Sequence, residues 1–214
     1  MCNSTQLCGL ICGSGRDCAR RISFGNSAVQ VTPIEPDLSE FFEALAPDIS
    51  EQELQSRIRS PKVRSVYRHW RDSRNGRAFP RRTDIDPAAM LEALPNITIT
   101  QISYDPFRVL YRLVGTEVAR WSKQDFTNKY ADELVFQDDD RDWTEYYRQT
   151  VAERAVCFGV TYWRETQARP HWIEHMICPL SSDGVTIDQC LAVEDYEKMS
   201  WREFEALPPV IPRS

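Results

Sequence analysis

The sequence lacks the features that would point to a membrane, secreted or nucleic-acid-binding protein. No apolar run approaches the roughly 20 residues that a membrane-spanning helix needs. No basic region precedes the small apolar patch near the N-terminus, which excludes an ordinary secretory signal. The net charge of −6 makes the average surface repel a polyanion such as DNA, and we interpret the local arginine cluster over 64–82 as a solvated helix face and loop. We therefore expect a cytoplasmic protein that binds no membrane and no nucleic acid.

The sequence also lacks the short motifs of common enzyme classes. It contains no Walker loop, no dinucleotide-binding glycine pattern, no zinc-hydrolase motif and no Ser-His-Asp order. The acidic run over 138–142 lacks further oxygen ligands at the spacing of calcium or magnesium sites, so it favours a solvated loop before a helix. We expect no catalytic residues and no metal site, and hence no enzyme.

Seven cysteines are present, and their odd number without a secretory signal favours free thiols in a reducing cytosol. Four of them lie near the N-terminus, namely Cys2, Cys8, Cys12 and Cys18. Only the spacing of Cys8 and Cys12 fits a zinc ligand pair, so a metal-free tail is favoured. Cys157 and Cys190 fall in expected strands, where buried and unreactive thiols are ordinary.

Composition divides the chain into four expected segments. The first is rich in Gly, Ser, Cys and Pro without a sustained period, which is typical of a disordered leader. The last contains a capping box that opens a short helix at Ser200. The expected boundaries are 1–36 for the leader, 37–60 for an N-terminal helical extension, 61–196 for the folded domain and 197–214 for a C-terminal helix and tail.

The extension is expected to hold two short helices. The apolar residues Phe41, Phe42 and Leu45 suggest the first helix, which Pro47 ends. A capping box over 50–53 predicts the second helix, over about 51–59.

A longer amphipathic helix is predicted to begin at Ser60-Pro61. Serine caps it, and proline occupies the first helical position, where its missing N–H costs nothing. Asn75-Gly76 ends it, and a further helix runs from the Asp86-Pro87 cap to Leu94-Pro95. Apolar side chains at i, i+3, i+4 and i+7 form a stripe that consists of Val63, Val66, Tyr67 and Trp70. We expect this stripe to pack on a sheet or to form a dimer surface.

Alternation and turn signals predict five strands, over 97–104, 107–114, 156–164, 171–180 and 186–196. Short turns join the last three, so these should form an antiparallel meander. In the second strand, strict alternation places Tyr111 and Leu113 on one face and Arg112 and Val114 on the other. Helices capped by Thr116 and Asp142 separate the second and third strands and can cover one face of the sheet.

An ordered set of motifs resembles a bacterial PAS-like family. The motifs are Tyr67-x-x-Trp70, Arg74-x-Gly76, Pro80-x-Arg82-x-Asp84-Ile85-Asp86-Pro87, Leu94-Pro95, Arg112-Leu113-x-Gly115-Thr116 and Pro179-Leu180. The resemblance covers about residues 62–195, with Asn128 in place of a family glycine. It implies an α+β fold in which helices cover one face of a PAS-like five-stranded antiparallel sheet and an N-terminal helix packs on the other. It also implies a sensory or regulatory module without established catalysis, which would signal in trans without its own output domain.

Aromatic residues gather in the segments expected near the cavity of such a fold. Ligand pockets are mostly apolar, with a few polar groups that orient the ligand. The candidate pocket residues are Arg112, Trp121, Phe126, Tyr130, Trp143, Tyr147, Tyr162 and His175. The alternative that the aromatic rings simply fill the core stays open. The expected partners are a small-molecule ligand, a second copy in a homodimer and a signalling protein.

A heme or thiol redox sensor is the alternative function. His175 could bind heme, and Cys178-Pro179 resembles a short heme-responsive motif. A heme PAS domain typically takes its histidine from the helix before the third strand, and residues 143–154 contain none. His171 and His175 would lie roughly 13 Å apart along one strand, too far to chelate one metal ion. No cofactor is assigned, and heme stays open beside a structural histidine that makes one hydrogen bond.

Overall fold

The computed structural model describes residues 41–136, 142–163 and 171–196. Within them, six strands form one antiparallel sheet in the order β1-β4-β5-β6-β2-β3. The strands are β1 (Phe41–Ala44), β2 (Ile97–Tyr104), β3 (Phe107–Val114), β4 (Cys157–Trp163), β5 (His171–Leu180) and β6 (Gln189–Asp195). The helices are α1 (Glu51–Arg57), α2 (Pro61–Ser73), α3 (Thr116–Trp121) and α4 (Trp143–Glu153), with short 3-10 helices η1 (Arg82–Asp84), η2 (Pro87–Asn96) and η3 (Ala131–Glu133). The predicted leader, 1–36, and the predicted C-terminal helix and tail, 197–214, lie outside the described residues.

All five predicted strands are present, but the prediction of a helix around Phe41 and Phe42 was wrong. These residues form β1, an edge strand that pairs with β4 and makes the sheet six-stranded rather than five-stranded. Adjacent side chains of a strand point to opposite faces of the sheet, so the rings of Phe41 and Phe42 contact different residues. The Phe41 ring meets Phe158 edge to face at 5.7 Å, and the Phe42 ring stacks on His175 at 5.3 Å.

A bulge in β3 overturns the strict alternation predicted for that strand. Ile99 lies opposite Leu113 but Thr100 lies opposite Tyr111, so Arg112 is the extra residue. Beyond it the faces exchange, because one inserted residue reverses the orientation of all that follow. Tyr111, before the bulge, is buried like Val109, whereas Leu113, beyond it, is exposed instead of sharing their face.

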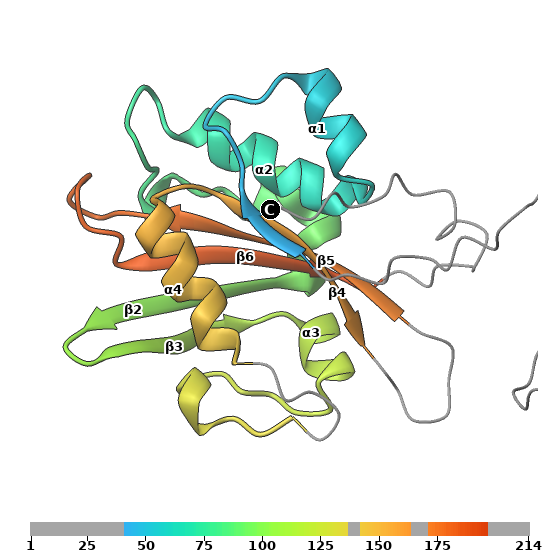
Figure 1. Cartoon of the computed structure of the whole chain (residues 1–214), viewed down its shortest axis with the longest axis vertical. Coiled ribbons are helices and arrows are strands. Elements are labelled where there is room, and N and C mark those ends of the chain that lie inside the picture. The colour runs from blue at the N-terminus through green and yellow to red at the C-terminus, as the bar shows by residue number, and fades with distance from the viewer. Residues whose placement is uncertain (1–40, 137–141, 164–170, 197–214) are drawn as a thin grey trace, which may run out of the picture. The chain divides into compact units, whose positions relative to one another are not determined.

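The two faces of the sheet are covered by different helices. Glu174 accepts hydrogen bonds from the backbone N–H groups of Arg59 and Ser60, at 3.1 and 2.7 Å, just before α2. His175, the next residue of β5, points the other way and contacts α4 through the Tyr146 ring at 5.4 Å. Figure 1 shows α1 and α2 together on one side and α4 crossing the strands. The prediction of an α+β fold with an antiparallel sheet and helices is therefore confirmed.

Helix α2 follows its sequence signals closely. The Ser60 side chain accepts a hydrogen bond from the Val63 N–H, and Asn75 and Gly76 take positive φ angles just beyond the helix. The Trp70 indole N–H donates a 2.8 Å hydrogen bond to the carbonyl of Pro179 in β5. All four residues of the predicted stripe are fully or almost fully buried, so of the two predicted uses the stripe packs on the sheet.

The remaining helices show two local departures from prediction. The segment after Asp86 is the 3-10 helix η2, with a kink at Met90, rather than an α-helix. The cap of α3 is Gly115 instead of Thr116. A Cβ atom at Gly115 would collide with backbone atoms of Pro95 and would stand 2.9 Å from the Ile97 carbonyl oxygen, so the close approach of η2 requires glycine. The predicted caps Ser50 and Asp142 do cap α1 and α4.

Candidate functional site

The candidate site lies on the sheet face beneath α4, where the β3 bulge and strand β6 bring unlike side chains together. Tyr111 of β3, just before the bulge, is buried on this face and packs against Tyr147 of α4. In β6, Glu194 lies opposite His175 of β5, and Tyr196 follows on the same face two residues later. The backbone carbonyl of Glu194 accepts a 2.8 Å hydrogen bond from the Asn96 side chain, which fixes the end of the strand.

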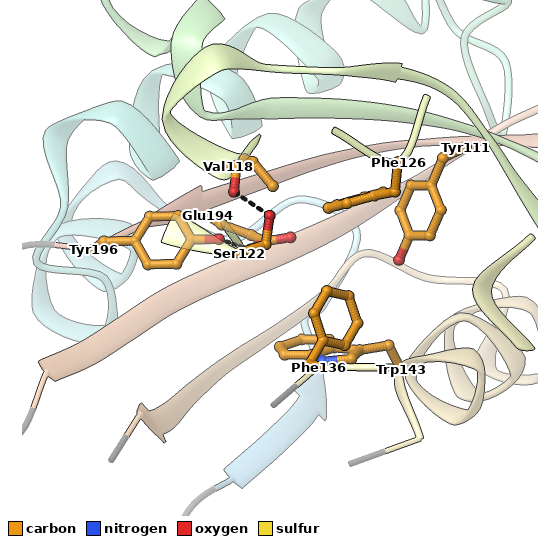
Figure 2. Close-up of a pocket in the computed structure, with 8 residues that line it drawn as sticks. All are labelled: Tyr111, Val118, Ser122, Phe126, Phe136, Trp143, Glu194 and Tyr196. Carbon is orange, nitrogen blue, oxygen red and sulfur yellow. Dashed lines mark hydrogen bonds between the residues drawn. The ribbon is translucent and has the colours of Figure 1, made fainter. Parts of the chain in front are cut away.

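These side chains and those of the neighbouring helices enclose a small cavity of about 20 Å³. The lining residues are Tyr111, Val118, Ser122, Phe126, Phe136, Trp143, Glu194 and Tyr196. Figure 2 shows the polar ends of Glu194, Ser122 and Tyr196 grouped at one end and the rings of Tyr111, Phe126, Phe136 and Trp143 around the other. The volume matches the space that one or two water molecules occupy.

The polar groups of the cavity are hydrogen-bonded to one another and to α3. The Tyr196 hydroxyl donates to the Glu194 carboxylate. The Ser122 hydroxyl donates to the Val118 carbonyl at 2.7 Å, within the last turn of α3. Burial raises the pKa of Tyr196 well above its usual value, and the nearby Glu194 charge raises it further. The same two causes, in the same order, raise the pKa of Tyr111.

The structure brings some of the predicted pocket residues to this cavity. Phe126 and Trp143 line it. Trp121 stacks on the Tyr196 ring at 5.2 Å, just behind the lining. Tyr147 packs against the Tyr111 ring at 6.2 Å and is buried.

His175 lies one layer further in, beneath Trp143. Its ring is 5.7 Å from that of Trp143, and the Phe42 ring covers it from the side of β1. Gly159, opposite His175 in β4, makes room for this stack, because a Cβ atom there would stand 2.8 Å from the Phe42 ring and 2.9 Å from the His175 ring. His175 is therefore enclosed by aromatic rings rather than exposed in the cavity.

Two predicted pocket residues lie elsewhere. Arg112 is the bulged residue, and its exposed side chain reaches Asn128 at 3.4 Å. Tyr130 pairs with Leu110 outside β3, where the Arg108 guanidinium covers its ring at 3.6 Å. Tyr130 was assigned to the pocket as one of the aromatic residues in segments expected near the cavity, and Arg112 as a polar group that could orient a ligand. The side chain of Tyr162, within β4, lies outside the described residues.

Six lining residues were missed by the sequence reasoning. Glu194 and Tyr196 carried a usable signal, since two polar side chains two residues apart in a predicted strand must share a face. Ser122, Val118 and Phe136 gave no signal in the sequence that pointed to the pocket. Tyr111 was assigned to a face but not to the pocket.

The buried thiols show no sign of a reactive centre. Burial raises the pKa of Cys157 to about 11 and raises those of Cys178 and Cys190 well above the usual value. Cys178 and His175 point to opposite faces of the sheet, because they are three residues apart on one strand. They therefore cannot act on one ligand together. The N-terminal cysteines lie outside the described residues.

The arginine cluster after Ser60 is engaged within the chain. Arg68 pairs with Glu51, Arg74 with Asp48, and the Arg77 guanidinium lies 2.5 Å from the Asp84 carboxylate. Arg64 donates to the carbonyls that precede α2. These contacts agree with the interpretation of the cluster as a solvated edge that holds α1, α2 and the following loop together.

The part of the chain that the structure describes lacks two further features. No group of three or more His, Cys, Asp or Glu side chains there could hold a metal ion. No helix there is long and apolar enough to cross a bilayer.

Comparisons with known proteins place this geometry in a family. Among solved structures, an RNA-binding light-oxygen-voltage receptor aligns at 10% identity and a TM-score of 0.43, over 75% of this chain and 39% of that receptor. A light-oxygen-voltage domain studied with a flavin analogue aligns at 15% identity and a TM-score of 0.40, over 56% of this chain and 87% of that domain. The dark structure of the blue-light photoreceptor Aureochrome1 LOV aligns at 13% identity and a TM-score of 0.40, over 56% and 86% of the two chains. This chain thus spans well under half of the length of the RNA-binding light-oxygen-voltage receptor.

A search of curated proteins finds no match. The sequence profile of the PAS domain family matches residues 58–193, which is well over half of the chain. The matched range begins just before α2 and ends within β6, so it contains the sheet strands β2 to β6 and most of the lining of the cavity. The chain therefore belongs to the PAS domain family.

Proposed function

We propose that this chain is a sensory module that binds a small ligand in the cavity beneath α4 and signals by association with a partner protein, without catalysis of its own. Membership of the PAS domain family supports a sensory role. The construction of the cavity supports the ligand.

The observation that carries the proposal is the composition of the cavity wall. Five of its eight lining residues are aromatic, and the polar groups of Glu194, Ser122 and Tyr196 converge at one end. Apolar walls with a few converging polar groups are the usual construction of a ligand site, in which the polar groups fix orientation.

The size of the cavity limits what enters it. A volume of about 20 Å³ accepts one small chemical group, well below the roughly 300 Å³ or more of pockets that enclose a drug-sized molecule. A larger ligand would have to displace a wall residue, and Phe136 is only half-buried. We therefore expect either a very small ligand or a ligand that inserts one group and widens the cavity at Phe136.

Native mass spectrometry tests the proposal, first on the purified protein and then after incubation with a pool of cell metabolites. Val118→Ile adds one methylene to the cavity wall and should abolish the bound mass. Val109→Ile is the matched control, because it adds the same group at another buried position, in β3, that lies outside the lining. If wild type carries no ligand in either experiment, or if both variants retain it equally, the cavity is not a ligand site.

Homodimerisation stays a prediction with a narrower basis. The apolar stripe of α2 that suggested it is buried within the chain, so a dimer would have to use another surface. Sedimentation velocity over a hundredfold range of concentration would show whether a dimer forms.

A further inference from the structure

Two buried carboxylates lie side by side on the face of the sheet that α2 covers. Glu174 of β5 pairs directly with Asp195 of β6, and the two residues are only 6% and 3% exposed. Paired residues of neighbouring antiparallel strands point to the same face, with Cβ atoms roughly 5 Å apart. Like charges at this distance repel each other, and burial makes each charge costly. Such a pair depends on hydrogen-bond donors from the rest of the chain.

The donors come from one short segment, residues 59–62, at the start of α2. The two oxygens of Glu174 accept hydrogen bonds from the backbone N–H groups of Arg59 and Ser60, at 3.1 and 2.7 Å. Asp195 accepts from the Ser60 hydroxyl at 2.6 Å and from the Lys62 ammonium group at 3.0 Å. Strands β5 and β6 lie in the middle of the sheet, so these contacts join the start of α2 to the centre of the fold.

Opposing effects act on the protonation of Glu174. Burial is the largest effect and raises its pKa, and the Asp195 charge acts in the same direction. The backbone hydrogen bonds of Ser60 and Arg59 and the Arg59 charge act the other way. If the segment moved away from the sheet, water would reach Glu174 and its pKa would return towards the ordinary value of 4.5. The closed arrangement therefore holds a proton on Glu174 more tightly than an open one.

The charges around Glu174 come from two sides. Among the described residues they are Asp195 of β6, Lys62 of α2 and Arg59 just before it. Its partner in β4 is Val160, which carries no charge. Lys62 pairs with Asp195 and balances that charge. Ionisation of Glu174 thus adds a second negative charge beside a carboxylate that already has its ion pair.

We propose that residues 59–62 form a proton-sensitive clasp with Glu174 and Asp195, which holds the start of α2 to the sheet more firmly near pH 4.5 than at higher pH. When the pH rises, Glu174 releases one proton to solvent, and its new charge favours the open clasp. The clasp goes beyond the proposed function and does not depend on it, because no ligand takes part.

Amide hydrogen exchange of the full chain between pH 4.5 and 8, followed by NMR, tests the clasp. The reporters are the N–H groups of Arg59 and Ser60, with rates corrected for the pH dependence of intrinsic exchange. Their protection should fall by up to about tenfold for each pH unit between 4.5 and the raised pKa of Glu174, and then level off, because opening releases one proton. Amides between β5 and β6 should stay better protected throughout, since the clasp opens without global unfolding.

A pair of variants assigns the effect to Glu174. Glu174→Gln nearly keeps the shape of the side chain and removes its titration, so the protection of the two reporter amides should become independent of pH. Glu145→Gln makes the same change on exposed α4, where Glu145 pairs with Arg148, and should keep the wild-type profile. An NMR titration of the Glu174 carboxyl carbon in wild type needs no variant, and its midpoint should lie above 4.5.

Three results would overturn the clasp. They are a protection of Arg59 and Ser60 that does not change with pH in wild type, an unchanged profile in Glu174→Gln, and exchange of these amides only together with the centre of the sheet. If Glu174→Gln fails to fold, a carboxyl midpoint at or below 4.5 in wild type would overturn it equally. The absence of any ligand by native mass spectrometry would refute the proposed function and leave the clasp standing.

Discussion

The hydrogen bond between α2 and the sheet allows a quantitative test of how this PAS domain is held together. Trp70 is 2% exposed, and its indole N–H donates to the Pro179 carbonyl at 2.8 Å. Trp70→Phe removes the donor and leaves a buried carbonyl without it, which costs about 1–3 kcal/mol. The smaller ring gives up roughly 50 Å² of buried apolar surface, or about 1 kcal/mol.

The two contributions predict a loss of about 2–4 kcal/mol in the free energy of unfolding, a large part of the roughly 5–15 kcal/mol that stabilises an ordinary domain. The assay is urea unfolding followed by tryptophan fluorescence and circular dichroism, with the slopes checked for two-state behaviour. Tyr67→Phe is the control on the same buried face of α2. Its hydroxyl lies 3.4 Å from the Pro47 carbonyl, a longer and weaker contact, so we expect a loss of about 0.5–1 kcal/mol.

Equal effects of the two substitutions would refute the reasoning, since Trp70→Phe loses the shorter hydrogen bond and part of the buried ring surface, whereas Tyr67→Phe loses only the longer hydrogen bond. A loss below about 1 kcal/mol for Trp70→Phe would refute it as well, because the desolvation cost of one unpaired buried carbonyl already reaches that value.

Three further predictions concern other parts of the sheet. Gly159→Ala should destabilise the chain by about 1–3 kcal/mol, because its Cβ atom would overlap the backbone carbonyl oxygen of Phe41 as well as the rings of Phe42 and His175. A Phe42→Ala background should relieve only part of that loss, since the Phe41 carbonyl stays in place, and an unchanged stability of Gly159→Ala in urea unfolding would count against the docking of β1. Burial raises the pKa of Glu174, and the Asp195 charge is a smaller cause in the same direction. The folded chain therefore binds more protons than the unfolded chain in this range of pH. The free energy of unfolding should then fall as pH rises from about 4.5 through the raised pKa of Glu174. Glu174→Gln should remove this slope, and an unchanged pH profile would contradict the assignment. A further variant replaces the four N-terminal cysteines with serine. In this variant an aromatic disulfide reagent at pH 8 should modify none of the remaining thiols until the protein is unfolded, because these thiols are buried. Rapid labelling of the native protein would instead support the thiol-sensor hypothesis. The buried thiols concerned are Cys157, Cys178 and Cys190.

Local signals in the sequence predicted most of the fold. The capping residues Ser50, Ser60 and Asp142 each mark a helix start in the structure, because a side chain that satisfies the first free N–H groups acts within three residues. The bounds of β2, β3 and β5 agree with those predicted, since alternation and turn residues are also local. These helix starts and strand bounds could be predicted because they depend on interactions between residues that are close in the sequence.

The three larger failures depend on distant contacts. Phe41 and Phe42 suit a helix or a strand equally, and only pairing with β4, more than 100 residues away, decides for β1. The bulge at Arg112 depends on two sets of contacts that β3 makes at once. One edge of β3 pairs with β2, and residues 128–130 pair with its other edge, as in the hydrogen bond from the Tyr111 N–H to the Lys129 carbonyl. The polar end of the cavity combines α3 with β6, which no local pattern brings together.

The composition of the candidate site could therefore be predicted only in part. The aromatic character of the pocket was visible in the sequence, and Phe126 and Trp143 do line it. The polar groups of the pocket belong to Glu194, Tyr196 and Ser122. Their hydrogen bonds, from Tyr196 to Glu194 and from Ser122 to the Val118 carbonyl, form only in the folded chain and could not be predicted from the sequence.

The most direct test of the account is a crystal structure of the protein with the ligand that native mass spectrometry identifies. The account predicts electron density between Trp143 and Glu194, beneath α4, with a polar atom of the ligand within hydrogen-bond distance of the Glu194 carboxylate. Ligand density at any other surface, with the cavity still closed by its aromatic rings, would contradict it.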